Sequence, residues 1–234
     1  MIRIVSLLSI ALVCASCTAR VNGSLMGDGQ ADLQIYAALE PRITRLISSI
    51  AAASGNLQPG APILDGPAIA ASMAQSQGID SVSLKNTAPT AIEGPVKITQ
   101  IGDFLASRRT GGFIRFMPNF PTGGRCTVNL NLNSGPEMMA LISSDVTAYL
   151  SALMAPLATG EALTREEYLD LVGSIYGSGI AEEISGARIY AAIDFPSAIK
   201  SVKGGTFSGK RAEFDIPLVD ILTLEKPLQY EVVW

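Results

Sequence analysis

Strand-like and helix-like patterns occur in blocks along this chain, and this order constrains the fold more strongly than any single motif. Apolar and polar residues alternate through residues 19–37 and again through most of the tail from residue 187, as in strands with one buried face. Residues 135–177 instead carry the apolar spacing of helices. Because a parallel α/β sheet requires strands and helices to alternate, we expect an α+β fold, with a mainly antiparallel sheet and helices packed on one face, after an N-terminal signal peptide.

The clearest local prediction is a hairpin across residues 19–37. Its turn is Gly27-Asp28-Gly29, and an Asp-Gly pair favours a tight hairpin turn because glycine readily adopts positive φ. Pro41 then suits the first position of a helix that ends near Gly55. Four apolar residues at helical spacing form the expected buried stripe of this helix: Ile43, Leu46, Ile47 and Ile50.

The remaining elements follow from the same two patterns. Helices are expected at residues 67–77, 103–107, 135–177 and 217–223. Strands are expected at residues 81–85, 95–101, 112–117, 125–132, 187–193, 198–203, 211–216 and 228–234. Thr164 and Glu167 have the spacing of a capping box, and Gly177 and Gly179 end the helical pattern. Because there is no internal repeat and no long linker, we expect residues 17–234 to form a single domain.

Residues 1–16 have the three-part layout of a secretory signal peptide. Arg3 supplies a short positive region, residues 4–13 are almost wholly apolar, and small residues follow. A helix that spans a bilayer needs about 20 apolar residues, so this run is too short to be a transmembrane anchor. We therefore expect the mature chain to be exported.

Cys17 is the expected site of lipid attachment. Lipoprotein signals place a cysteine directly after small residues, and Ala15 and Ser16 precede Cys17. Cys14 is the other candidate, but the branched side chain of Val13 precedes it. We expect acyl chains such as palmitate on Cys17 to hold the protein at a membrane of the bacterial cell envelope, on its periplasmic or surface face. The alternative is simple cleavage and release of a soluble secreted protein.

Charge and composition exclude several classes of function. The net charge is −4, from 17 basic and 21 acidic residues, which argues against a nucleic-acid partner. The chain has no histidine, which removes Ser-His-Asp and Cys-His catalysis and most zinc and copper sites. We therefore expect no metal and no cofactor.

Cys126, in the alternating run 125–132, is expected to be a core-facing strand residue.

Two motifs resemble catalytic signatures but lack essential parts. Residues 204–211 nearly match a phosphate-binding loop, yet Arg211 replaces the hydroxyl that binds Mg²⁺, and a strand-like segment follows where a helix is required. We interpret this segment as a glycine-rich hairpin turn. Ser197 and Lys200 match the S-x-x-K pair of penicillin-binding enzymes, but the run looks extended, which would point the two side chains to opposite faces. We therefore assign no catalytic residue, and a serine-type hydrolase remains a minor alternative.

The acidic residues do not form a convincing calcium or acid/base site. Asp28 and Asp32 have the spacing that begins a calcium-binding loop, but Leu39 stands where the glutamate ligand should be. The pairs Glu166-Glu167 and Glu182-Glu183 are expected on solvated helix faces, because adjacent residues of a helix diverge.

Residues 138–158 contain very little charge, and two interpretations of this segment stay open. Its apolar periodicity favours a pair of core helices. The alternative is a lid over an apolar cavity, because the segment has no basic residues with which to bind an anionic lipid surface.

Four stretches of the sequence resemble envelope lipoproteins of spirochaetes. They are residues 14–17, 23–33, 214–224 and 230–234. The chain is also similar to mycobacterial LppM-type envelope proteins, in having an exported sheet with a late Gly-rich hairpin and a final Trp-bearing strand. These resemblances imply an envelope location without an established enzyme activity, and they supply no catalytic residues.

These patterns together predict a non-enzymatic, lipid-anchored envelope protein that binds an apolar ligand or a partner protein. The apolar ligand is suggested by the composition, in which 48% of residues are hydrophobic and 16% are charged. A purely structural or assembly role in the envelope is the alternative, and the sequence does not separate the two.

Overall fold

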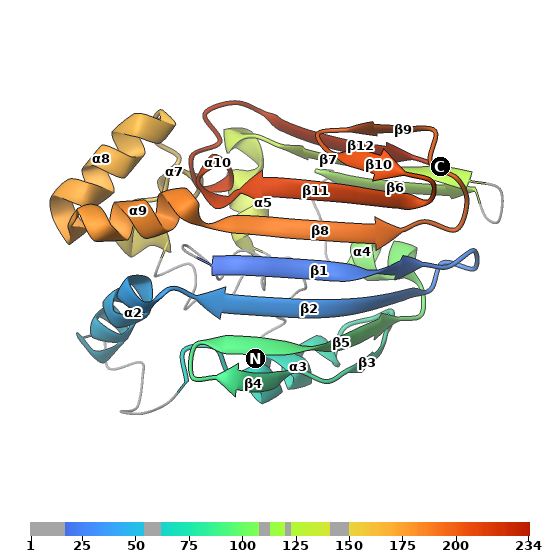
Figure 1. The fold of residues 1–234 in the computed structure, drawn as a ribbon, viewed down its shortest axis with the longest axis horizontal. Helices are drawn as coiled ribbons and strands as arrows, with labels where there is room; N and C mark the ends of the chain where they lie inside the picture. The colour runs from blue at the N-terminus through green and yellow to red at the C-terminus, as the bar shows by residue number, and fades with distance from the viewer. Residues whose placement is uncertain (1–16, 54–61, 108–112, 120–122, 141–149) are drawn as a thin grey trace.

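The computed structural model describes residues 17–53, 62–107, 113–119, 123–140 and 150–234. These residues form two sheets and a set of short helices (Figure 1). The expected signal peptide, Cys14 and Gly55 lie outside the described residues.

The large sheet has eight strands, in the order β10-β11-β8-β1-β2-β5-β3, with β4 also paired to β5. Its strands are β1 (Cys17–Leu25), β2 (Ala31–Leu39), β3 (Ile79–Val82), β4 (Lys85–Ala88), β5 (Ala91–Ile98), β8 (Arg188–Asp194), β10 (Thr206–Ser208) and β11 (Arg211–Pro217). Strands β1 and β8 are parallel, and the other described pairings are antiparallel. The predicted N-terminal hairpin is confirmed as β1 and β2, and Gly29 in its turn has a φ of 90°.

A second, smaller sheet has the order β6-β7-β12-β9. Its strands are β6 (Ile114–Asn119), β7 (Gly123–Leu130), β9 (Ser201–Lys203) and β12 (Leu228–Val233). Trp234, directly after β12, is fully buried and packs between two other aromatic rings. Its ring centroid lies 5.9 Å from that of Phe116 and 4.8 Å from that of Phe195. The C-terminal segment is therefore part of a packed sheet, as the alternation in residues 228–234 predicts.

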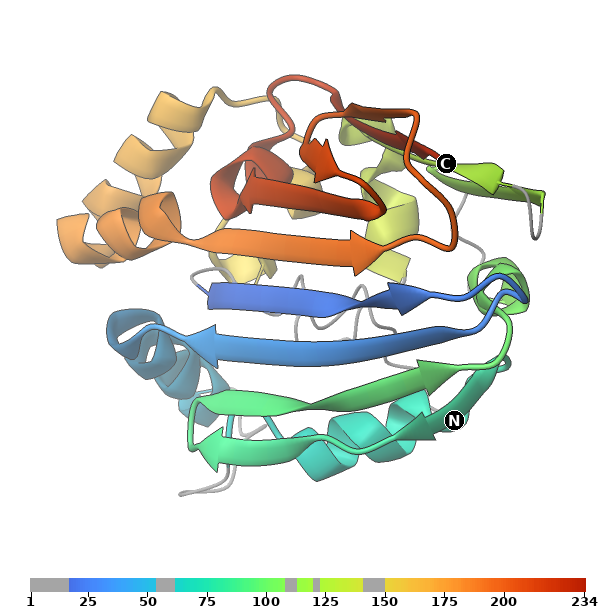
Figure 2. The ribbon, with the colours of Figure 1, turned by 45° about the vertical axis from the view of Figure 1, so that its right-hand side comes forward.

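The helices lie on the inner face of the large sheet and at its ends. They are α2 (Pro41–Ala53), α3 (Gly66–Met73), α4 (Ile101–Ser107), α5 (Gly135–Ala140), α7 (Pro156–Thr159), α8 (Arg165–Tyr176), α9 (Ser178–Gly186) and α10 (Leu218–Thr223), with a 3₁₀ turn at Leu132–Ser134. Figure 1 shows α3 and α5 behind the sheet, and α2, α8 and α9 beyond the end at which β1 begins. Figure 2 shows the same three helices at that end from another side. The start of α4 lies at the other end, beside the β1–β2 turn (Figure 2). This architecture confirms the predicted α+β class with a mainly antiparallel sheet.

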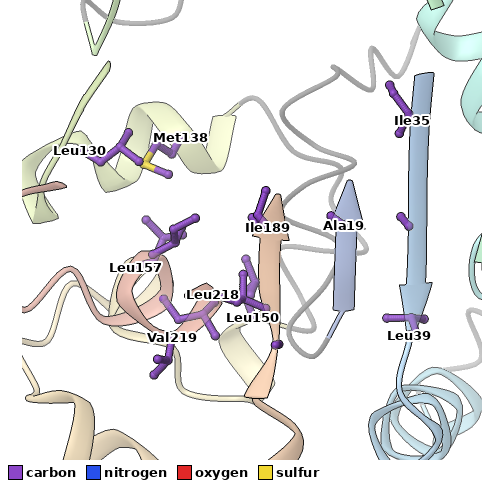
Figure 3. Packing of buried hydrophobic residues seen from close by; sticks show 14 of the residues in the cluster. Ala19, Ile35, Leu39, Leu130, Met138, Leu150, Leu157, Ile189, Leu218 and Val219 are labelled. Atoms are coloured by element: carbon purple, nitrogen blue, oxygen red, sulfur yellow. The ribbon is translucent and has the colours of Figure 1, made fainter. Parts of the chain in front are cut away.

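The core fills the space between the inner face of the large sheet and the helices (Figure 3). Because side chains alternate along a strand, every second residue of the central strands points inward, as Ala19, Ile35 and Ile189 do. Residues from helices complete the same cluster, among them Met138, Leu157, Leu218 and Val219. Each large aliphatic side chain that is buried in this way stabilises the fold by about 1.5–3 kcal/mol.

The sequence places Glu182 and Glu183 on a helix but does not predict the bounds of helix α9. Gly177 ends α8 as expected, with a φ of 96°, but the chain turns there and starts a new helix in which Gly179 is an interior residue. Two apolar residues of α9, Ile180 and Ile184, lie one helical turn apart and are both buried. Their burial stabilises this helix despite its glycines, an effect of tertiary packing that overrides local propensity.

The first turn of α2 is capped by a residue that is far away in the sequence. The carboxylate of Glu183, on α9, accepts hydrogen bonds from the backbone N–H of Arg42 at 3.1 Å and of Ile43 at 3.0 Å. Helix α2 has no acidic residue in its own first turn, so this carboxylate satisfies N–H groups that the helix leaves unpaired. Glu182 beside it makes a surface ion pair with Arg42 at 3.5 Å. The expectation that both glutamates lie on a purely solvated face is therefore wrong for Glu183.

Replacing Glu183 with alanine should destabilise the protein by about 1 kcal/mol, because the capping interaction at α2 is lost. The matched control is Glu182→Ala, which removes a surface ion pair and should change the free energy of unfolding by less than about 0.5 kcal/mol. Urea denaturation of the two variants measures the difference. Equal effects would contradict the capping role.

Candidate functional site

A hollow of about 790 Å³ lies on the outer face of the large sheet, over β1, β2, β4 and β5. The strand pleat explains its lining, because residues between the inward-facing core positions point outward. In Figure 1 no described helix lies in front of these strands. We call this site the outer hollow, and its main polar lining residues are Arg20, Asn22, Gln34, Tyr36, Lys85 and Glu93.

Arg20 and Tyr36, which both line the outer hollow, face each other across the β1–β2 pair. The guanidinium carbon of Arg20 lies 6.0 Å from the centroid of the Tyr36 ring, which is within the range of a cation–π contact. Within the described residues no carboxylate forms an ion pair with Arg20. Its guanidinium donors are thus held over an aromatic ring and remain available to a partner.

The rest of the outer hollow carries both signs of charge. Lys85 Nζ lies 3.2 Å from Glu93 Oε1, and Glu40 adds a second carboxylate at the rim. The amides of Asn22 and Gln34 supply donors and acceptors between these charges. Such a lining can orient a polar partner that carries both positive and negative charges, by hydrogen bonds and ion pairs.

The structure does not assemble the Ser197/Lys200 pair. Residues 197–200 are irregular, whereas the S-x-x-K chemistry requires both residues on a helix. Lys200 Nζ instead donates a hydrogen bond to the carbonyl oxygen of Trp234 at 3.0 Å. The ammonium is thus used to hold the C-terminal segment and does not activate Ser197.

The Gly-rich segment 204–211 contains the predicted hairpin turn, at Gly209 and Lys210 between β10 and β11. Gly204 and Gly205 instead connect β9 of the small sheet to β10 of the large sheet. Lys210 Nζ donates to the carbonyl oxygen of Pro196 at 2.9 Å. No helix follows Arg211, which begins β11. The lysine and the backbone therefore lack the geometry of a phosphate-binding loop.

The remaining acidic candidates have structural roles. Asp28 accepts from the backbone N–H of Gln30 at 3.1 Å and stabilises the β1–β2 turn. Glu167 forms the predicted capping box with Thr164, and hydrogen bonds from the Thr164 backbone and hydroxyl lower the pKa of its carboxyl. Within the described residues no three metal-ligating side chains come together.

The described parts of residues 138–158 belong to the core. Met138, Leu150, Leu153 and Leu157 are each at most 3% exposed, and residues 141–149 lie outside the described residues. The buried ends of the segment support the core interpretation over the lid.

Tyr168 is fully buried, and its hydroxyl has no hydrogen-bond partner among the described residues. Burial raises the pKa of this phenol.

Cys17 is the first residue of β1, where it pairs with Leu39 of β2. The expected lipid-bearing residue is thus part of a central strand. In the described part of the chain, no helix is long and apolar enough to cross a bilayer.

The outer hollow itself could not be found from the sequence. Nothing local in the sequence shows that β1, β2 and β4 bring Arg20, Tyr36 and Lys85 together. The strand alternation does mark Arg20 and Tyr36 as outward-facing positions, and this is the one signal that points toward them.

Cys126 should react slowly with thiol reagents in the folded protein. It lies on β7, packed against the core, and burial raises the pKa of its thiol to about 11. At pH 8 its thiolate fraction should therefore be roughly 100-fold below that of an exposed cysteine. The measurement is labelling by iodoacetamide of a protein with Cys14→Ser and Cys17→Ser, in which Cys126 is the remaining thiol. Equal rates in native buffer and in urea would contradict the burial.

No protein-family model matches the chain, and no curated protein matches it. Among solved structures the chain is similar to the NMR structure of the folded domain of LppM from Mycobacterium tuberculosis. The identity is 11%, the match covers 93% of this chain and 88% of that chain, and the TM-score is 0.42. At this score the likeness is weak, and it carries no conclusion about function.

Proposed function

We propose that this chain is an exported, lipid-anchored protein without enzymatic activity, which binds a partner protein on the outer face of its large sheet. The observation that carries the proposal is the outer hollow. It combines Arg20, which lies over Tyr36 and makes no ion pair with the described residues, with charges of both signs close to the strand that begins at Cys17. The anchor itself rests on the small residues before Cys17.

The lining supports a partner protein rather than an apolar ligand. Sites for apolar molecules are enclosed and lined mainly by hydrophobic side chains. The outer hollow is open and lined largely by charged and amide groups, whereas the apolar residues 150–158 pack into the core. Arginine and tyrosine are also the residue types that most often dominate the binding energy of protein interfaces.

The proposal that the chain has no enzymatic activity is supported by the structural contacts of its two lysine candidates. The chain has no histidine, Lys200 holds Trp234, and Lys210 holds the carbonyl of Pro196. None of these groups lies in the outer hollow. The proposal therefore assigns binding to the outer hollow and no chemistry to the rest of the described chain.

Replacing Cys17 with serine should abolish lipid attachment, because the thiol is the acceptor. Cys14→Ser is the matched control and should leave the lipid in place, since Cys14 falls within the cleaved peptide. Intact mass spectrometry of the chain expressed with its signal, together with labelling by a palmitate analogue, reads both variants. Loss of lipid in Cys14→Ser but not in Cys17→Ser would contradict the assignment.

A photoreactive amino acid in place of Gln34 should form a discrete crosslinked adduct with one partner in the intact envelope. The matched control replaces Glu213, which lies in the same row across the same outer face but on β11. Three strand spacings, roughly 14 Å, separate the two positions. Adding Arg20→Ala should weaken the adduct at position 34 by about tenfold, the effect of truncating an interface arginine. The same adducts at both positions, or none at position 34, would contradict the proposed face.

A further inference from the structure

The large sheet begins at the residue that is expected to carry the lipid. Cys17 opposes Leu39 of β2, and Thr18 already opposes Arg188 of β8. No residue is therefore left between the anchor and the sheet to act as a flexible spacer. Whatever end of the molecule surrounds Cys17 must lie at the surface of the bilayer.

Two helices leave the sheet at this same end. Helix α2 begins two residues after Leu39, and α9 ends two residues before Arg188. The two helices contact each other through the Arg42–Glu182 ion pair and the cap formed by Glu183. Figures 1 and 2 both show α2, α8 and α9 beyond the start of β1.

At this end of the molecule, the turn between α8 and α9 lies farthest from the start of β1 (Figures 1 and 2). Helix α9 has nine residues, so its start at Ser178 lies roughly 13 Å from the end that joins β8. In the last turn of α8, next to this tip, Ile175 is 49% exposed. An isoleucine that is half exposed at a helix end is suited to contact the boundary between headgroups and acyl chains.

Helix α2 adds one uncompensated basic side chain at this end. Arg45 is exposed and makes no ion pair with any described residue, whereas Arg42 is paired with Glu182. The Arg45 side chain can reach an anionic headgroup while its methylene stem covers apolar surface. The apolar tip and Arg45 thus belong to the same end of the molecule as the anchor.

We infer that the bilayer docks against this end of the molecule, at the α8–α9 tip and the first turns of α2. This inference rests on the lipidation of Cys17 in the proposed function and adds an orientation to it. The strands then stand on the membrane with Cys17 at their base, and the outer hollow opens sideways. A partner that binds the outer face then approaches parallel to the membrane. This partner is itself held at the same membrane surface.

The experiment places a tryptophan at the tip and measures its quenching by lipid. Ile175→Trp is made in the full chain, purified in its lipidated form and reconstituted into vesicles of phosphatidylethanolamine and phosphatidylglycerol, with or without bromine near the headgroup end of the acyl chains. The matched control is Met26→Trp, an exposed apolar residue in the turn at the opposite end of β1. The native Trp234 is fully buried, and the unsubstituted protein supplies its background.

Docking predicts that bromine quenches most of the added emission at position 175 and leaves the emission at position 26 unchanged. A flexible Gly-Ser spacer inserted between Cys17 and Thr18 should reduce the quenching at position 175, because it frees the sheet from the surface. Lipidated protein that is bound to vesicles but shows no quenching at position 175, or equal quenching at both positions, would overturn the orientation alone. A mass spectrum without lipid on Cys17 would overturn the proposed anchor, and the orientation with it.

Discussion

The fold depends on the pairing of β1 with its two neighbours. On one side β1 pairs with β2 along its whole length, through a short local turn. On the other side it pairs in parallel with β8, from Thr18↔Arg188 to Ser24↔Asp194, a stretch of chain that lies far away in the sequence. Without this second pairing the large sheet would separate into two parts, each with an exposed edge and an uncovered apolar face.

The inner and outer faces of the sheet follow from the same strand. Ala19 and its inward-facing neighbours close the core against α5, α7 and α10, whereas Arg20 and its outward-facing neighbours line the outer hollow. Because α9 leads directly into β8, the β1–β8 pairing also brings α9 beside α2, where Glu183 can cap the incoming helix. The position of β1 thus determines three features. They are the place of the proposed anchor, the contact between α2 and α9, and the proposed binding face.

The features that the sequence predicts well are local. The hairpin around Asp28, the helix that begins at Pro41 and the capping box of Thr164 each depend on residues that are close together along the chain, and the structure contains all three. The parts that it does not predict join distant segments. From the sequence Glu183 is expected to be a surface residue, and only the structure places α2 beside it. Arg20 is expected to be an ordinary outward-facing residue, and only the structure aligns Tyr36 and Lys85 with it.

The high share of apolar residues leads to one expectation from the sequence and to another from the structure. The apolar composition suggests an apolar ligand, but in the described structure the apolar residues fill the core and the outer hollow is polar. A sequence shows how much apolar surface a chain must bury, and it does not show whether that surface is buried by the chain itself or by a ligand.

The central claim is that the strand which carries the proposed anchor is built into the sheet from its first residue. Hydrogen–deuterium exchange of the lipidated, vesicle-bound protein tests this claim most directly, because it reports the protection of each backbone amide. Protection should be comparable along β1 and β8, and it should begin within the first residues after Cys17. Rapid exchange through Thr18 to Val21, with protection starting only later in β1, would show a flexible tether and would contradict the account.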